Sequence, residues 1–172
     1  LMKQYPVKNY WALGTNTFRV ANNVEEFVQA AKIIGIEISV ISGIQEAVLI
    51  YAGVITALPL VDSRRLIIDI GGGSTEIIVG QKHDRLLTES LSIGSVSWRD
   101  KFFNNKENES GLLMKQMDLG VAAAKQLFDS ISPGIDKANW SEAYASSGTV
   151  KMLALICEAH GYGEKQIQLA AL

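Results

Sequence analysis

The chain is poor in the residues on which several classes of protein depend. Its 172 residues include one cysteine, two histidines and three prolines. Cys157 cannot form a disulfide within the chain, and its apolar segment KMLALICEAHG predicts a small core residue on a helix. Neither His83 nor His160 has a cysteine or a second histidine at a ligand spacing, which argues against a metal site built on them. His160 precedes Gly161 and is expected near a helix C-terminus.

Long apolar runs and an excess of positive charge are also missing. No apolar run reaches the ~18 residues of a membrane span, so no membrane partner is expected. The 16 Lys and Arg residues are balanced by 18 Asp and Glu residues, which argues against general nucleic-acid binding. This net charge does not exclude a small polyanion as a substrate, because a few arginines and backbone N–H groups can bind it locally. No secretory signal opens the chain, so a cytoplasmic location is expected.

The rest of the sequence has the composition of an ordinary globular protein, with 48% hydrophobic and 20% charged residues. Apolar residues recur at helical spacing in some segments and alternate in others. Helices are expected at residues 24–34, 42–58, 96–103, 112–131 and 149–161. Strands are expected at residues 11–14, 36–41, 66–70, 76–79, 85–93 and 142–148, the third to fifth forming an antiparallel meander. A loop is expected at 104–111, and the proline-containing break at 59–65 is the candidate boundary between two lobes.

The segment LIIDIGGGSTEIIVG at 66–80 places three glycines between two apolar runs. Gly71, Gly72 and Gly73 allow positive φ angles and leave no Cβ on the turn. Their bare N–H groups, followed by the hydroxyls of Ser74 and Thr75, predict a phosphate-binding cradle. A flexible hairpin tip is the alternative. The pattern is neither a Walker loop, since no lysine follows the glycines, nor a Rossmann loop, since a strand follows them.

Two carboxylates flank the glycines. Asp69 ends an apolar run, where a carboxylate needs a partner, and beside a phosphate cradle it suits a hard cation such as Mg²⁺. An Asx-type turn bond to the Gly71 N–H is the alternative. Glu76 opens the next strand and is a second candidate for the same cation or for a bond to the loop. A solvated position at a strand edge is nearly as plausible for Glu76.

Four segments, in this order, carry a resemblance to a known family. They are GTNTFRVANN at 14–23, ISGIQEAVLIYAGV at 41–54, RLIIDIGGGSTEIIVG at 65–80, and SLSIGSVSW at 90–98 followed by SSGTV at 146–150. Together they resemble the Ppx/GppA phosphatases, which are exopolyphosphatases and guanosine pentaphosphate phosphohydrolases, over nearly the whole chain. The segment DIGGGSTE is similar to the phosphate-binding hairpin of the actin/hexokinase/Hsp70 ATPase-like fold.

The resemblance implies an α/β fold of ribonuclease-H-like lobes, with mixed sheets flanked by helices and the active site in the cleft between lobes. Residues 1–63 then form the C-terminal part of a first lobe, and residues 64–172 form a second, incomplete lobe. The family's earlier D-x-G-S-N-S type loop is absent, and residue 1 is Leu. The chain is therefore expected to be a fragment of a longer enzyme, and the activity of the isolated fragment is left open.

The resemblance also assigns roles to residues. Glu46 matches the catalytic base of the family's ISGxEEA motif, although Gln45 replaces the preceding Glu. Asp69 matches the residue associated with Mg²⁺, residues 71–74 match the phosphate-binding turn, and Arg19 matches an arginine expected to face the phosphate chain. Gly148 lies in a strand-to-helix turn whose N–H groups are candidates for a phosphate or nucleotide.

Each of these roles has a simpler alternative. Glu46 lies in the first turn of a helix, where a carboxylate also balances the helix dipole. Arg19 is also explained as a surface arginine near a helix start, and Gly148 by an N-cap at Ser147. Arg64 and Arg65 are adjacent and point in opposite directions on a strand, so solvation is expected for them.

The implied activity is hydrolysis of the terminal phosphoanhydride bonds of polyphosphate, of the 5′-phosphate of pppGpp, or of both. Glu46 would activate water, while the loop from Asp69 to Ser74 would bind phosphate and Mg²⁺. One alternative is an ATP-dependent phosphotransferase or actin-like ATPase of the same fold. A further alternative is a non-catalytic protein that binds (p)ppGpp or polyphosphate. The resemblance also makes a homodimer plausible.

Overall fold

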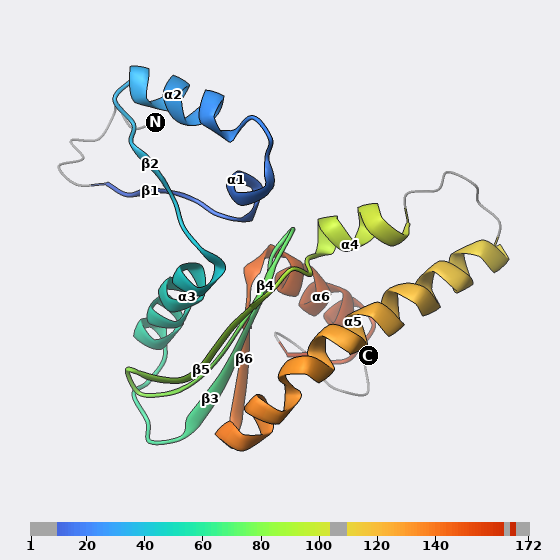
Figure 1. The fold of residues 1–172 in the computed structure, drawn as a ribbon. Coiled ribbons are helices and arrows are strands. Elements are labelled where there is room, and N and C mark those ends of the chain that lie inside the picture. Colours follow the sequence, from blue (N-terminus) through green and yellow to red (C-terminus); the bar gives the residue numbers. More distant parts are fainter. Residues whose placement is uncertain (1–9, 104–109, 164–165, 168–172) are drawn as a thin grey trace. The chain divides into compact units, whose positions relative to one another are not determined.

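The computed structural model describes residues 10–103, 110–163 and 166–167, which form two compact units, Leu1–Ser42 and Gly43–Leu172. In the first unit, β1 (Ala12–Gly14) pairs in parallel with β2 (Ile38–Val40). Helices α1 (Asn16–Val20) and α2 (Val24–Ile33) connect these two strands (Figure 1). The short α1 has no counterpart in the sequence predictions, because five residues are too few to show a helical period.

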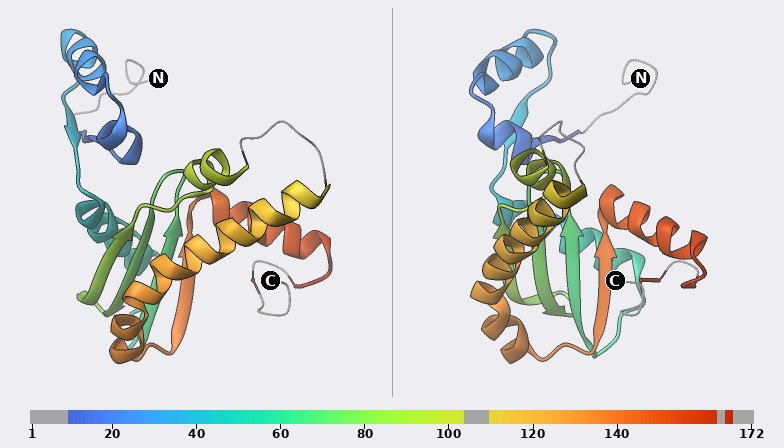
Figure 2. Two further views of the ribbon diagram at one scale, coloured as in Figure 1. Left: turned by 45° about the vertical axis from the view of Figure 1, so that its right-hand side comes forward. Right: turned by 90° about the vertical axis from the view of Figure 1, so that its right-hand side faces the viewer.

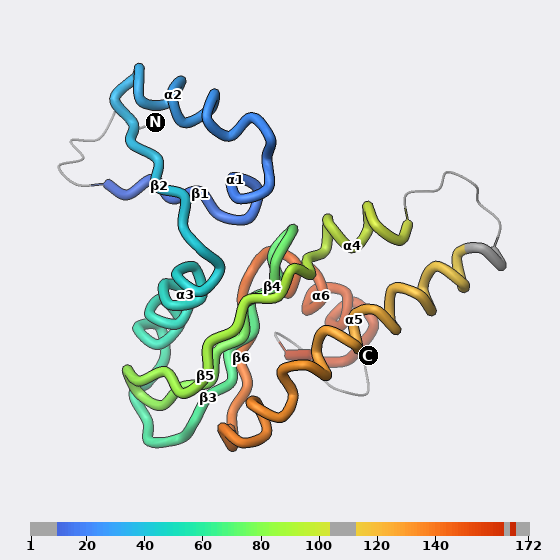
Figure 3. The backbone as a smooth tube through the Cα atoms, in the orientation of Figure 1, coloured from blue at the N-terminus to red at the C-terminus, as the bar shows by residue number. Residues whose placement is uncertain are grey.

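The second unit is built on a four-stranded mixed sheet with the strand order β5-β4-β3-β6. The expected meander is confirmed, because β4 pairs antiparallel with both β3 and β5, while β6 runs parallel to β3. The strands are β3 (Arg64–Ile70), β4 (Thr75–Gln81), β5 (Asp84–Leu91) and β6 (Glu142–Ser146). The helices are α3 (Gly43–Ala57), α4 (Ser95–Phe102), α5 (Ser110–Ala138) and α6 (Ser147–Ala159). Figure 3 follows the chain through these elements.

Helices cover both faces of this sheet (Figure 2). Each face carries a hydrophobic core. Helix α3 packs on the face that presents Ile67 and Ile78, and α5 packs on the face that presents Leu66 and Val79. Successive side chains of a strand point to opposite faces. Asp69 therefore lies on the α3 face, two residues beyond Ile67. The carboxylate before the glycines is thus directed toward α3.

Helix α5 runs past the predicted end at residue 131 and contains Pro133. Proline removes one backbone hydrogen bond from a helix interior. Ile131, Ile135 and Ala138 nevertheless pack against the sheet core, and this packing outweighs the local penalty. Of the segment 104–111, predicted to be a loop, residues 104–109 lie outside the described part of the chain, and the last two residues begin α5.

Arg65 corrects the expectation of a solvated arginine. Its side chain is buried, its Nε donates to Glu142 Oε2 at 2.8 Å, and its guanidinium lies 5.4 Å from the ring centre of Tyr144. Glu142 is its direct neighbour on β6. Arg64 points the other way, as expected, and its Nη1 donates to the carbonyl of Ala138. The pair at Arg65 joins β3 to β6 at the end of the sheet away from the glycines.

Candidate functional site

The glycine loop is a tight connection between β3 and β4. The Gly71 N–H donates to the Ser74 carbonyl at 2.9 Å, so it does not make the Asx-type bond to Asp69 that the sequence left open. The N–H groups of Gly72 and Gly73 have no hydrogen-bond partner within the described residues. These two donors are therefore the ones that an anion could take up without breaking an existing bond.

The three glycines of the loop do not adopt positive φ angles. Positive φ angles occur at Gly35, Gly161 and Gly163, but at none of the three glycines of the loop. Instead, the loop packs against Gly94, where a Cβ would lie 2.4 Å from the Gly73 nitrogen and 2.5 Å from the Gly72 carbonyl carbon. The positive φ angles that these glycines allow are therefore not used in this loop, and the missing Cβ is required at Gly94.

The N-terminus of α4 holds this loop through its first N–H groups. Ser95 N–H donates to the Gly71 carbonyl at 3.0 Å, and the N–H groups of Val96 and Ser97 donate to the Gly72 carbonyl at 2.8 and 2.9 Å. These donors have no partner inside their own helix, so the loop carbonyls satisfy them. The loop is thereby tied to a rigid element.

The two hydroxyl residues that follow the glycines are buried. Thr75 is 1% exposed, and its hydroxyl donates to the Ile93 carbonyl at 2.6 Å. Ser74 is 5% exposed and hydrogen-bonds Glu76. Both side chains therefore fasten the loop, and phosphate binding by either hydroxyl stays a prediction.

A row of four polar side chains crosses the sheet beside the loop. Asp69 on β3 and Glu76 on β4 are direct cross-strand neighbours, so their side chains share the α3 face. Ser146 on β6 stands next to Asp69 and donates its hydroxyl to Oδ2, while Ser90 on β5 donates to Glu76 Oε1 at 2.9 Å. The carboxylates are thus adjacent, with one hydroxyl bonded to each from the outer strands.

Glu76 is the most buried charged side chain of this row, with 1% exposure. The solvated edge position left open by the sequence is therefore wrong, because β4 is a central strand. Burial raises the pKa of Glu76, the hydrogen bonds from Ser90 and Ser74 partly oppose this, and the charges of Glu46 and Asp69 raise the pKa further. The charges of two further carboxylates, Glu46 and Asp69, therefore act on Glu76 at this end of the sheet.

This raised pKa predicts the pH dependence of stability. A carboxyl group whose pKa is higher in the folded state contributes stability that is fully present below its unfolded pKa and is lost as the pH rises through the folded pKa. The free energy of unfolding of Glu76→Gln, relative to that of the natural protein, should therefore be higher at pH 8 than at pH 4.5. Urea unfolding at both pH values, with EDTA present, measures this difference.

Glu142→Gln is the matched control for that measurement. Its hydrogen bond with Arg65 lowers the pKa of Glu142, so its contribution to stability is present above the unfolded pKa and is lost as the pH falls. The stability deficit of Glu142→Gln should therefore grow with pH, opposite in sign to the Glu76→Gln effect. Parallel pH profiles for the two variants would contradict the assignment of the buried acid.

Glu46 lies in the first turn of α3, in the same compact unit as the glycine loop. A Cβ on Gly43, at the start of α3, would lie 2.0 Å from the Ser90 hydroxyl and 3.7 Å from Glu76 Oε1. The missing side chain at Gly43 thus lets the α3 N-terminus approach the carboxylate row. The structure places Asp69 beside Glu76 on neighbouring strands, and the charge of Glu46 also raises the pKa of Glu76. The expected division into lobes at 63/64 stays a prediction.

The junction of β6 and α6 also meets this site. The Ser147 hydroxyl donates to the Ile70 carbonyl at 2.5 Å, and the hydroxyls of Ser95 and Thr149 lie 3.1 Å apart. Gly148 is exposed, with no other side chain within 4 Å of the position of a Cβ. The Ser147 hydroxyl therefore does not make the N-cap bond that was the alternative explanation of this turn. A phosphate contact at Gly148 stays a prediction.

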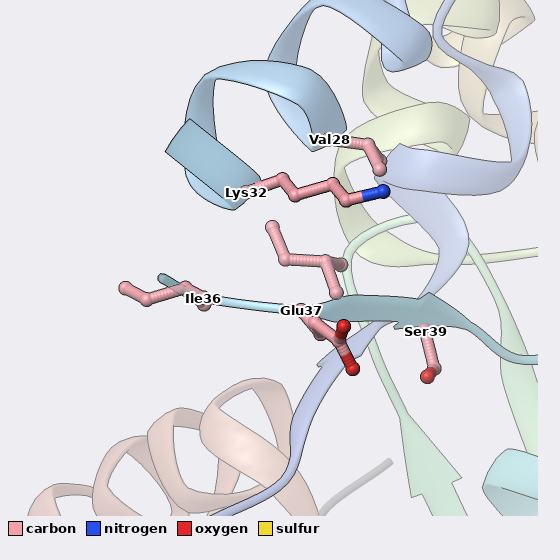
Figure 4. A pocket seen from close by; sticks show the side chains of 6 residues that line it. Val28, Lys32, Ile36, Glu37 and Ser39 are labelled. Atoms are coloured by element: carbon pink, nitrogen blue, oxygen red, sulfur yellow. The ribbon is translucent and has the colours of Figure 1, made fainter. Parts of the chain in front are cut away.

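Arg19 belongs to the first unit, where its Nη1 donates to the Ile41 carbonyl at 2.9 Å. Its contact with a phosphate chain is therefore still a prediction. The same unit has a pocket whose lining includes Lys32, Glu37 and Ser39 (Figure 4). None of the residues predicted for catalysis or phosphate binding lines this pocket.

The carboxylates fit Mg²⁺ by their chemistry rather than as a complete cage. Within residues 10–103, 110–163 and 166–167, no three His, Cys, Asp or Glu side chains are grouped closely enough to hold a metal ion. Mg²⁺ commonly uses only one or two protein carboxylates, with water and substrate phosphates as its remaining ligands. Asp69 and Glu76, adjacent beside the glycine loop, are compatible with that mode of binding.

Two smaller expectations about helix α6 are confirmed. Cys157 is buried on α6 and His160 is the C-terminal cap residue of that helix. In the described part of the chain, no helix combines the length and apolar character that crossing a membrane requires.

The fold is that of an α/β protein with a mixed sheet flanked by helices, as predicted. The model of the Ppx/GppA phosphatase family matches residues 1–172, and the chain belongs to this family. A guanosine-5′-triphosphate,3′-diphosphate pyrophosphatase of Aliivibrio fischeri is 37% identical over 164 residues, which are 95% of this chain and 32% of the relative. A Vibrio cholerae protein with the same name is also 37% identical, with the same coverage.

Solved structures support the same assignment. An exopolyphosphatase from Cytophaga hutchinsonii has a TM-score of 0.78 at 28% identity, covering 98% of this chain and 53% of that protein. A family member from Aquifex aeolicus has a TM-score of 0.63 at 25% identity, covering 95% of this chain and 50% of that protein. The chain thus spans about a third of the length of the curated relatives and about half of these solved structures.

Proposed function

We propose that the full-length protein containing this chain hydrolyses terminal phosphoanhydride bonds, with pppGpp or inorganic polyphosphate as substrate. The observation that carries this proposal is the adjacent pair Asp69 and Glu76 beside the N–H groups of Gly72 and Gly73, which have no partner among the described residues. The names of the relatives support the choice of substrate: the curated ones are guanosine pentaphosphate pyrophosphatases, and one solved structure is an exopolyphosphatase.

Hydrolysis requires binding of the phosphates, an oriented water molecule and an in-line path. The Gly72 and Gly73 N–H groups bind oxygens of the terminal phosphates, held in place by the bonds from α4 to the loop carbonyls. Glu46 orients the attacking water and accepts its proton. Arg19 pairs with phosphate oxygens in the assembled protein.

Asp69 and Glu76 provide the oxygen ligands for Mg²⁺, which when bound neutralises charge on the phosphates. Glu76 is the more costly of the two to ionise, because it is buried and next to Asp69 and Glu46. An adjacent cation offsets that cost, because an opposite charge favours the ionised form of a carboxyl group. The buried carboxyl pair thus favours cation binding.

A comparison of substrates tests the proposed function. The full-length protein, with Mg²⁺, should release phosphate from pppGpp, polyphosphate or both at least ~100-fold faster than from ATP. Phosphate release is measured with each substrate at equal concentration, and Mg²⁺ removal by EDTA should abolish it.

Two results would contradict the proposal. Acceptor-dependent transfer of the ATP γ-phosphate would identify a phosphotransferase. Tight binding of pppGpp or polyphosphate by calorimetry, without turnover, would identify a non-catalytic binding protein. The ratio of pppGpp to polyphosphate rates also determines which branch of the family this protein resembles in its activity.

A further inference from the structure

Ser146 stands where a helix N-cap is expected, yet its side chain does something else. It is the N-cap residue of α6, and serine at this position normally accepts a hydrogen bond from the first turn of its helix. Ser146 makes no such bond; its hydroxyl donates to Asp69 Oδ2 instead. The chain thus gives up a stabilising cap in favour of a contact with the carboxylate beside the glycine loop.

The next residue reinforces the same junction. Ser147 has a φ of 92°, which is unusual for a residue with a side chain, and its hydroxyl donates to the Ile70 carbonyl. Both serines therefore direct their hydroxyls to the last two residues of β3. Strain at this position is tolerated only when neighbouring contacts hold it, and the contacts here converge on Asp69 and Ile70.

The orientation of Asp69 depends on this contact. The terminal torsion of an aspartate side chain is broad and nearly two-fold, so a carboxylate without a partner samples several orientations. The bond from Ser146 selects one orientation by holding Oδ2 toward β6. On the other side of β3, Glu76 is the neighbour of Asp69 across the antiparallel pair.

We propose that Ser146 is a positioning residue, which orients the Asp69 carboxylate for Mg²⁺ and does not itself touch substrate. This inference rests on the proposed function, because it gives Asp69 the role of a cation ligand. Partners that orient metal ligands in this way typically contribute 10- to 100-fold to metal affinity. A purely structural Ser146 would instead change stability and leave cation affinity unaltered.

The chain provides a matched control for this bond. Ser63, the residue before β3, donates its hydroxyl to Glu142 Oε1 on β6 at 2.9 Å. This is also a hydrogen bond from a serine to a carboxylate. It lies at the opposite end of the strands, beside Arg65. Ser63→Ala removes a contact of the same chemical type without altering the carboxylate row.

The test uses the full-length protein with Ser146→Ala, Ser146→Thr and Ser63→Ala. Calorimetric titration with Mg²⁺ alone should show affinity weakened 10- to 100-fold in Ser146→Ala, and within about threefold of the natural protein in Ser146→Thr and Ser63→Ala. The Mg²⁺ concentration for half-maximal phosphate release should rise by the same factor in Ser146→Ala, while the rate at saturating Mg²⁺ falls less.

If Ser146→Ala fails to fold, the pair Ser146→Thr and Ser146→Val replaces it, because these variants share a shape and differ by the hydroxyl. Equal Mg²⁺ affinities in that pair, or an affinity within threefold of the natural protein in Ser146→Ala, would overturn the positioning role. Failure of the proposed function is a separate result, since it appears as absent phosphate release in the natural protein at saturating Mg²⁺.

Discussion

Glu46→Gln in the full-length protein should lower kcat for phosphate release by about 10²- to 10⁴-fold, the usual contribution of a general base. Glutamine keeps the size and hydrogen-bonding reach of the side chain but cannot accept the proton of the attacking water. KM should change little, because the substrate is held by the glycine loop and not by Glu46. Phosphate release from pppGpp and polyphosphate, measured at saturating substrate, checks the result.

The alternative explanation of Glu46 is that it only balances the dipole of α3, and a second helix provides the control. Glu26 also lies in a helix first turn, that of α2. Glu26→Gln should reproduce any loss of dipole stabilisation, which is about 0.3–1 kcal/mol, without the loss of kcat. If Glu46→Gln keeps kcat within threefold on both substrates, Glu46 is not the base.

The structure gives this assignment a context that the sequence lacked. Glu46 is half-buried, and its charge contributes to the raised pKa of Glu76. A carboxylate that only balanced a dipole could lie anywhere around the first helical turn. Its proximity to a buried acid is instead what an active site with several carboxylates requires.

The elements of the sheet were readable from local pattern. Alternating apolar residues and short polar turns predict the meander of β3, β4 and β5, and these periods depend only on neighbours in the chain. The resemblance likewise predicted the family and its fold class, which the match over residues 1–172 confirms. Predictions of this kind succeed because their information is contained in one continuous segment.

The environment of each acid was less predictable, because it depends on residues far away in sequence. Glu76 looked as if it could be solvated, yet β5 supplies Ser90 on one side and β3 supplies Asp69 on the other. The partner of Arg65, Glu142, comes 77 residues later. No local pattern reveals which strand will pair with which, and therefore which charge will be buried.

The glycine motif illustrates the same limit. Three consecutive glycines suggested special backbone angles, but none of them has a positive φ, and the close approach of the loop to the start of α4 depends instead on the missing Cβ of Gly94. Gly94 was part of the matched segment SLSIGSVSW, although no residue-level argument connected it with the loop. A contact between two glycine segments leaves no periodic signal, because neither contributes a side chain.

Gly94→Ala should therefore lower the rate of phosphate release by about 100-fold or more. Its φ of −150° and ψ of 162° suit alanine, so the effect comes from space alone. The added Cβ would fall 2.4 Å from the Gly73 nitrogen and 2.6 Å from the Gly72 carbonyl oxygen, and a backbone cannot rotate away as a side chain can. Relief requires the loop to separate from α4, which misplaces the N–H groups by a distance that typically costs about 10²-fold in rate.

Gly53→Ala separates this effect from a general intolerance of alanine. Gly53 lies within α3, where a Cβ would meet nothing within 4 Å, so alanine there should stabilise the protein by up to ~1 kcal/mol and leave kcat unchanged. Gly94→Ala should also lose about 1–3 kcal/mol of unfolding free energy through overpacking. Thermal unfolding and phosphate release measured on both variants decide the matter: if Gly94→Ala matches Gly53→Ala in both, the contact between Gly94 and the loop does not position the phosphate-binding donors.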